Sequence, residues 1–284
     1  MSARNGKYQY WDMVAVVATI VVAVIADTVV GDFPVDIFSF PLNIIIVVLW
    51  LALLVELYRR RANSSIAQYM LSLRATWLSL GLMAAVGIML GTQLKPATTS
   101  WVVVGSILFI LSHLWMVILR GWRNKQGIRL RFILTHFGLW LALAAGFWGA
   151  ADREELRMVV ESGKPTDMTI DEMGQPAILD YDIELLNFDV EYYDNGTPSS
   201  YEAMVAVENR DVSLRVNKPY NHTLSETIYL VSYGANANGE PYCILEIVRE
   251  PWRWISTAGI IMLLAGSVML FLRGPQRAKN KDTE

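Results

Sequence analysis

Long apolar runs, nearly free of charged residues, recur along the chain at lengths near the roughly 20 residues that a helix needs to cross a bilayer. We therefore predict a membrane α-helical bundle with six transmembrane helices, over residues 13–30, 42–58, 75–92, 101–119, 132–150 and 254–272. No small-residue cleavage pattern follows the first run, so we expect this helix to be retained rather than removed as a signal peptide.

Between the fifth and sixth runs, apolar and polar residues alternate instead. The alternating segments are DYDIELLNFDVEYY, YEAMVAVEN, VSLRVNKPY, TIYLVSYG and YCILEIVRE, and they predict about five strands. Asp194-Asn195-Gly196 and Asn238-Gly239 tolerate positive φ and mark turns. Residues 151–253 are therefore expected to form a small extracytoplasmic antiparallel β domain. It would begin with a polar, partly helical neck from Asp152 to Glu161 and a linker from Gly163 to Pro176.

Basic residues are distributed unevenly over the short connections between the predicted helices. Fifteen Lys and Arg residues precede the first helix, link the second to the third, link the fourth to the fifth, or follow the sixth. The opposite short loops contribute Lys95 alone. Because Lys and Arg resist translocation, we expect both termini to be cytoplasmic, residues 273–284 to form a cytoplasmic basic tail, and 151–253 to lie outside.

Composition narrows the possible functions. Hydrophobic residues make up 54% of the chain and charged residues only 18%, which argues against a soluble enzyme. The external segment holds twenty acidic and eight basic residues. Without an outward-facing basic stripe there is nothing to neutralise phosphates, so nucleic acid is not an expected partner.

Few residues are available for metal or redox chemistry. A single cysteine, Cys243, excludes an intramolecular disulfide, an iron–sulfur cluster held by four thiolates and a cysteine-rich zinc site. The β domain has no nucleophile elbow, Gly-rich phosphate loop or clustered metal ligands, so we assign no catalytic residue. We interpret His222 as a solvated turn residue and Cys243 as a buried, inert thiol.

The two other histidines lie at similar depth in the membrane. His113 is seven residues before Arg120 and His136 is five residues after Arg131, which places them about 10 and about 8 Å inside the cytoplasmic boundary. Their helices are joined by a short basic hairpin and should be antiparallel neighbours. Paired imidazoles beside planar apolar groups suit a bis-histidyl haem b; the nearby rings are Trp115, Phe132, Phe137 and Trp140.

The alternative explanation needs no cofactor. A single histidine per helix can be held by a neighbouring hydroxyl, such as that of Ser112 or Thr135. The sequence by itself leaves both interpretations open.

The segment DIELLNFDVEYYDNGTPSSYEAMVAVEN…VSLRVNKPYNHTLSETIYLVSYG, with the final strand, REPWRW and a closing helix ending in LRGPQR, resembles the ResB (CcsB) family of cytochrome c biogenesis proteins. Its features include a Val-Asn-x-Pro step at Val216-Asn217-Lys218-Pro219 and a strand at Tyr229–Tyr233. The likeness extends over residues 180–273 and, less closely, 132–160. Beside that family, the chain looks like a compact version with a different front half.

This resemblance implies haem transport in a bacterial plasma (inner) membrane. The chain would be the haem-handling partner of a CcsA-type cytochrome c synthase subunit, and the two would deliver haem across the membrane to apocytochrome c. It lacks the tryptophan-rich loop of the CcsA partner and so is not a fused synthase. The resemblance implies an intramembrane His as haem ligand: His136 in THFGLW is the first candidate, and His113 is the second by depth alone. The cytoplasmic basic residues Arg123, Lys125, Arg129 and Arg131 would pair with the haem propionates at the entry side.

Two other function classes compete with this hypothesis. In the first, the chain is a non-catalytic membrane-anchored scaffold or sensor, embedded in membrane lipid, whose β domain binds a protein partner. The second is a dihaem electron-transfer protein, but two bis-histidyl haems would need four intramembrane histidines and only two exist. In the main hypothesis the chain is an accessory subunit of a haem-attachment complex and has no turnover of its own.

Overall fold

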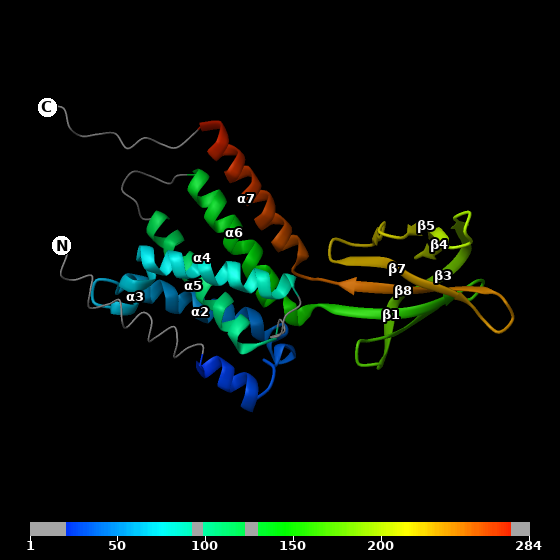
Figure 1. Cartoon of the computed structure of the whole chain (residues 1–284), viewed down its shortest axis with the longest axis horizontal. Coiled ribbons are helices and arrows are strands. Elements are labelled where there is room, and N and C mark those ends of the chain that lie inside the picture. The colour runs from blue at the N-terminus through cyan, green and yellow to red at the C-terminus, as the bar shows by residue number, and fades with distance from the viewer. Residues whose placement is uncertain (1–20, 93–98, 123–129, 274–284) are drawn as a thin grey trace. The chain divides into compact units, whose positions relative to one another are not determined.

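The structure of the protein is a computed structural model, which describes residues 21–92, 99–122 and 130–273 (Figure 1). The chain divides into two compact units. A helical unit comprises Met1–Ala151 and Ile255–Glu284, and a β unit comprises Asp152–Trp254.

Five helices of the described chain are long and apolar enough to cross a membrane: α2 (Leu42–Arg59), α4 (Leu73–Gly91), α5 (Trp101–Trp122), α6 (Leu130–Trp148) and α7 (Arg253–Arg273). Three shorter helices are η1 (Val35–Phe38), α3 (Ser65–Met70) and η2 (Ala150–Asp152). These helices support the prediction of a membrane protein with several spanning helices. The predicted count of six is not confirmed, because the first helix lies partly outside the described residues; of its length, residues 21–29 are helical.

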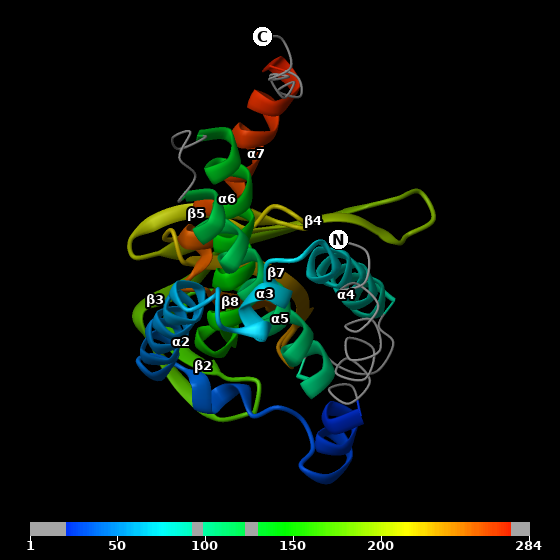
Figure 2. The ribbon, with the colours of Figure 1, turned by 90° about the vertical axis from the view of Figure 1, so that its left-hand side faces the viewer.

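Helix α5 is the centre of the helical unit. It contacts α2, α4 and α6 (Figure 2) and is the most buried of the five long helices. Its N-terminus is capped from a distant segment: the Asp27 carboxylate accepts hydrogen bonds from the backbone N–H of Trp101 at 2.8 Å and from the Ser100 hydroxyl at 2.7 Å. Such a cap satisfies donors that the first turn of a helix leaves free.

Helix α6 packs closely on α7 through glycine. A Cβ added to Gly138 would lie 2.6 Å from the backbone N of Leu263, and one added to Gly259 would lie 2.5 Å from the backbone N of Ala142. Small residues at a crossing let two helical backbones approach, which is how helices associate in lipid. These glycines therefore fix α6 against the closing helix.

The β unit is one eight-stranded antiparallel sheet with the order β5-β4-β3-β2-β1-β8-β7-β6. Its strands are β1 (Glu154–Glu161), β2 (Thr166–Ile170), β3 (Pro176–Tyr192), β4 (Pro198–Val207), β5 (Arg210–Arg215), β6 (Tyr220–Asn221), β7 (Glu226–Ala235) and β8 (Pro241–Arg249). The sheet curls so that β5 comes near β6 and β7, and its inner face encloses one apolar core (Figure 1). The antiparallel β domain is confirmed, and β3, β4, β5, β7 and β8 follow the five predicted segments. VSLRVNKPY was predicted as one strand, but β5 ends at Arg215 and only the last residue of the segment, Tyr220, belongs to β6.

The predicted turns are also confirmed. Gly196 (φ 79°) and Gly239 (φ 82°) adopt positive φ, and the side chain of Asn195 accepts from the backbone N–H of Thr197 at 3.0 Å. In the Val-Asn-x-Pro step, Asn217 has a φ of 59° and the Lys218 N–H donates to the Arg215 carbonyl at 3.0 Å. The step is therefore a tight turn between β5 and β6.

The predicted helical neck and the linker after it were wrong, because these segments form β1 and β2. Leu156, Met158 and Val160 are buried at every second position of β1. They face Ile247, Leu245 and Cys243 of β8 in register. Arg157 between them, and the glutamates at both ends of the strand, made a half-buried strand look like a polar segment.

Candidate functional site

The two candidate histidines lie on neighbouring antiparallel helices, α5 and α6. A Cβ added to Gly121 near the end of α5 would lie 2.0 Å from Cε1 of Phe132 near the start of α6. Only glycine leaves room for this ring, so the two helices approach closely at this end. Further along, the rings of Trp115 and Trp140 lie 4.9 Å apart between their centroids.

His136 is held by its own helix. Its Nδ1 lies 3.0 Å from the backbone carbonyl oxygen of Phe132 and 3.0 Å from the hydroxyl of Thr135, and its ring stacks on that of Phe132 at 4.0 Å. A carbonyl oxygen only accepts, so Nδ1 carries the hydrogen and Nε2 keeps its lone pair. Within the described part of the chain, no hydrogen bond reaches Nε2. This is the tautomer of an imidazole ready to bind a metal.

His113 has a different partner. It is 4% exposed, and its Nδ1 lies 2.8 Å from the backbone carbonyl oxygen of Met70, the last residue of α3. Two turns further along the same face of α5, Arg120 donates to the carbonyl of Leu71 at 2.8 Å. Both side chains therefore satisfy carbonyl groups that the end of α3 leaves without helical partners.

The structure does not bring the two imidazoles onto one surface. His113 and Trp115 are two residues apart, about 200° around the helix axis. Trp115 contacts Phe137 and Trp140 of α6, whereas His113 contacts α3. The Ser112 hydroxyl, considered above as a partner for histidine, instead donates to Leu108 of its own helix, while Thr135 does lie beside His136.

Three rings near His136 form a cluster between α5 and α6. Phe137 and Trp140 are nearly parallel, with centroids 6.0 Å apart, and Trp115 lies 6.4 Å from Phe137. The indole N–H groups of Trp115 and Trp140 are buried and have no hydrogen-bond acceptor in the described structure. Flat apolar surfaces, a free imidazole nitrogen and unpaired donors are a set of groups that suits a porphyrin.

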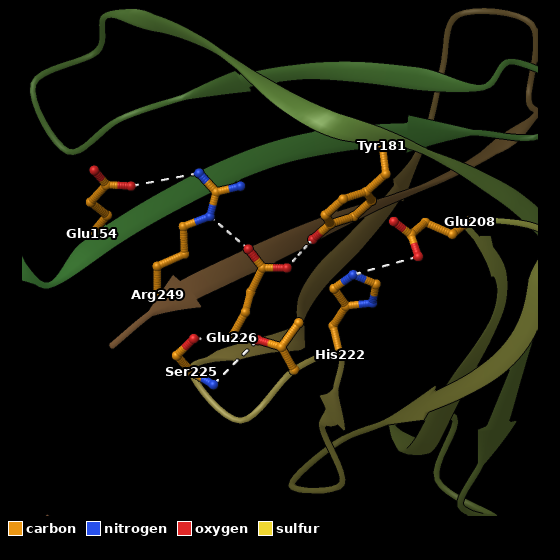
Figure 3. Close-up of polar contacts among 8 residues, drawn as sticks. Glu154, Tyr181, Glu208, His222, Ser225, Glu226 and Arg249 are labelled. Carbon is orange, nitrogen blue, oxygen red and sulfur yellow. Dashed lines mark hydrogen bonds and ion pairs between the residues drawn. The ribbon is translucent and has the colours of Figure 1, made fainter. Parts of the chain in front are cut away.

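The β unit contains a polar cluster that the sequence analysis missed (Figure 3). Glu226, only 6% exposed, accepts from the hydroxyl of Tyr181 and from Nε of Arg249 at 2.6 Å, and Arg249 also pairs with Glu154 at 3.7 Å. Burial and then the bond to Glu226 raise the pKa of Tyr181. Burial by itself would lower the pKa of Arg249, but Glu226 raises it above its ordinary value. The cluster ties β1, β3, β7 and β8 together.

The interpretation of His222 as a solvated residue was wrong. Its side chain is 13% exposed, and its ring lies 4.5 Å from that of Tyr181, with Nε2 3.9 Å from the Glu208 carboxylate (Figure 3). The interpretation of Cys243 is confirmed: the thiol is fully buried, and burial raises its pKa to about 12. Among the described residues, no group of three His, Cys, Asp or Glu side chains is arranged to hold a metal ion.

Comparison with known proteins supports the resemblance found in the sequence. The family model described as the ResB-like family matches residues 128–241, a segment that includes α6 with His136 and most of the β unit. This match confirms the likeness to the ResB family over that segment, and so supports a role in cytochrome c biogenesis.

The comparison with solved structures adds less than the family match. One entitled "Cytochrome c Heme Lyase CcmF" is 12% identical with a TM-score of 0.37, and the alignment covers 72% of this chain and 35% of that chain. The chain thus spans about a third of the length of that protein, and at this TM-score the likeness carries no argument. No curated protein matched the sequence.

Proposed function

We propose that this chain binds haem b within the membrane and takes part in cytochrome c biogenesis, with His136 as an axial ligand of the haem iron. The observation that carries the proposal is that the ResB-like match covers the helix on which His136 keeps a free Nε2. When bound, haem would supply the iron to which the imidazole nitrogen binds. Haem would also be the group that is delivered.

The residues around His136 would each have a defined task. Phe132 and Thr135 hold Nδ1 and so orient the ring. Trp115, Phe137 and Trp140 present apolar faces that exclude water. Arg131, at the start of α6, would pair with propionates at the entry side. Its proposed companions Arg123, Lys125 and Arg129 lie outside the described residues.

His113 is the weaker of the two candidate ligands. Its Nδ1 is also bonded to a carbonyl oxygen, so its Nε2 has the same lone pair, but its neighbours are Met70 of α3 and Phe109 of its own helix. We propose that its main role is to hold the end of α3 and that His136 binds the iron without it.

The proposal extends to the setting of the reaction. We place the chain in a bacterial inner membrane, with both termini in the cytoplasm and the β unit outside, on the strength of the loop charges. The chain would work with a CcsA-type subunit that presents haem to apocytochrome c. The β unit's acidic balance and lack of an assigned catalytic set suit an accessory role.

A second candidate function is a membrane-anchored scaffold or sensor whose β unit binds a protein. The hydrogen bonds already made by both histidines favour it, because they explain these residues without a cofactor.

The absorbance spectrum of the chain purified in mild detergent separates the two candidates. Haem binding predicts the Soret and α bands of a b-type haem, together with co-purification of a CcsA-type subunit. A colourless chain that is recovered alone, from cells that continue to mature cytochrome c, would favour the scaffold.

A further inference from the structure

Three tryptophan side chains in the helical unit have buried indole N–H groups with no acceptor in the described structure: Trp115, Trp140 and Trp148. Two other indoles of the described chain are bonded: Trp101 donates to the Gly31 carbonyl at 3.0 Å, and Trp252 donates to Asp152 at 2.6 Å. A buried donor is seldom left unpaired, above all in a bilayer where no water replaces the partner. The unpaired donors therefore need an explanation.

Two of these donors lie beside the proposed haem ligand. Trp140 is one helical turn from His136 on the same face of α6, about 6 Å along the axis, and is only 6% exposed. Trp115 reaches it from α5, with ring centroids 4.9 Å apart. The two indoles and the ring of Phe137 thus lie together at one part of the α5–α6 interface.

The chemistry of these donors selects the form of the ligand. An indole N–H is a neutral donor, and an ionised carboxylate at this depth would lose its hydration without gaining an opposite charge. A protonated carboxylic acid is neutral and still offers a carbonyl acceptor. Arg131, nine residues before Trp140 and about 13 Å away along the helix, suits the ionised form instead.

We propose, resting on the proposed haem-binding function, that the indole N–H groups of Trp115 and Trp140 hydrogen-bond the neutral propionic acid groups of a porphyrin inside the membrane. Arg131 then attracts the ionised propionates at the entry side, where each carboxylate takes up one proton from the water of the cytoplasmic side, and the tryptophans receive the neutral acids. The two tryptophans are positioning residues for a ligand that has to carry its polar groups through a medium of low dielectric constant.

The test uses the full chain in lipid nanodiscs and two metal-free probes, so that iron ligation by His136 is not required. Protoporphyrin IX carries two propionic acids, and etioporphyrin carries no oxygen. The double variant Trp115→Phe/Trp140→Phe keeps two aromatic rings and removes both donors. We expect the affinity of the double variant for protoporphyrin IX to be roughly tenfold lower than that of the wild type. Its affinity for etioporphyrin should equal that of the wild type.

The control is Phe137→Leu, which removes a ring but no donor, and which should weaken both probes to the same extent. Equal weakening of both probes by the double variant would overturn the proposal, since the rings would then only pack. No weakening, or no binding of protoporphyrin IX to the wild type, would overturn it as well. In that case the N–H groups serve the packing of one ring on the other.

A measurement on the wild-type chain covers the case in which the variants fail to fold. With ¹⁵N-labelled tryptophan, two indole N–H resonances should move downfield on addition of protoporphyrin IX and stay in place with etioporphyrin. Identical spectra with both probes would contradict the proposal. Failure of the proposed function can be told apart from failure of this inference. If the proposed function is wrong, the wild-type chain shows no iron–imidazole haem spectrum, whatever result the two metal-free probes give.

Discussion

The carbonyl oxygen of Phe132 lies 3.0 Å from Nδ1 of His136, one turn along α6. This contact fixes the tautomer of the imidazole and leaves Nε2 as its only free lone pair. It is the same arrangement that a second residue provides in many metal sites, but here the helix backbone supplies it. His136 is thereby oriented before any ligand binds.

Replacing His113 should affect stability rather than haem binding. His113→Ala removes the donor to the Met70 carbonyl at the end of α3, and a buried carbonyl left unpaired costs about 1–3 kcal/mol. We expect a lower thermal midpoint and an unchanged haem spectrum. Ser112→Ala is the control, since the Ser112 hydroxyl bonds only within its own helix. A weaker or high-spin spectrum for His113→Ala would show that both histidines bind iron.

Breaking the polar cluster of the β unit should destabilise it. Glu226→Gln removes the charge that pairs with Arg249, and we expect a loss of about 2 kcal/mol, below the figure for a fully buried pair because Arg249 is partly exposed. Glu246→Gln is the matched control, because its partner Arg157 is 66% exposed. Urea unfolding of the full chain, followed by the β-sheet circular dichroism, measures both. Equal losses would contradict the assigned role of Glu226.

The burial of Cys243 predicts a specific dependence on alkaline pH. Because burial raises the pKa of this thiol to about 12, its contribution to stability is present below its ordinary pKa and is lost as the pH rises from about 9 toward about 12. Tyr181 is present in both proteins, so any effect of its ionisation cancels in the difference between their stabilities. The stability difference between wild type and Cys243→Ala should therefore shrink over this range, as measured by unfolding at each pH. A constant difference would contradict the prediction.

The orientation of the chain can be tested with introduced cysteines. The native Cys243 is buried and should give no background with an impermeant maleimide. We expect Asn195→Cys to be labelled from outside and Lys279→Cys only after the membrane is opened. Labelling of position 195 from the cytoplasmic side alone would reverse the orientation, and with it the depth assigned to both histidines.

Much of the fold was predictable because its signals are local. Apolar run lengths indicated α2 and α4 to α7, and alternation with turn residues indicated β3, β4, β5, β7 and β8. Strand β1 was missed because Glu155 lies directly before its buried residues and Arg157 lies between them. Its character also depends on pairing with β8, some 90 residues further along the chain.

The candidate site was predictable only in part. The sequence indicated His113, His136 and the aromatic rings, but the partner of His113 is a backbone carbonyl of α3, and a carbonyl has no sequence signature. The cluster around Glu226 joins residues that lie 45 and 23 positions away. A single acidic residue at the start of an apolar strand gave no sign that Tyr181 and Arg249 would surround it.

The most direct test of the central claim is the haem absorbance of His136→Ala, purified in detergent beside the wild type. We expect the variant to lose most of the haem absorbance, and added imidazole to restore part of it by filling the vacated coordination position. If His136→Ala and the double variant with His113→Ala both keep the wild-type spectrum, neither histidine binds the iron, and both serve only the packing of α3, α5 and α6.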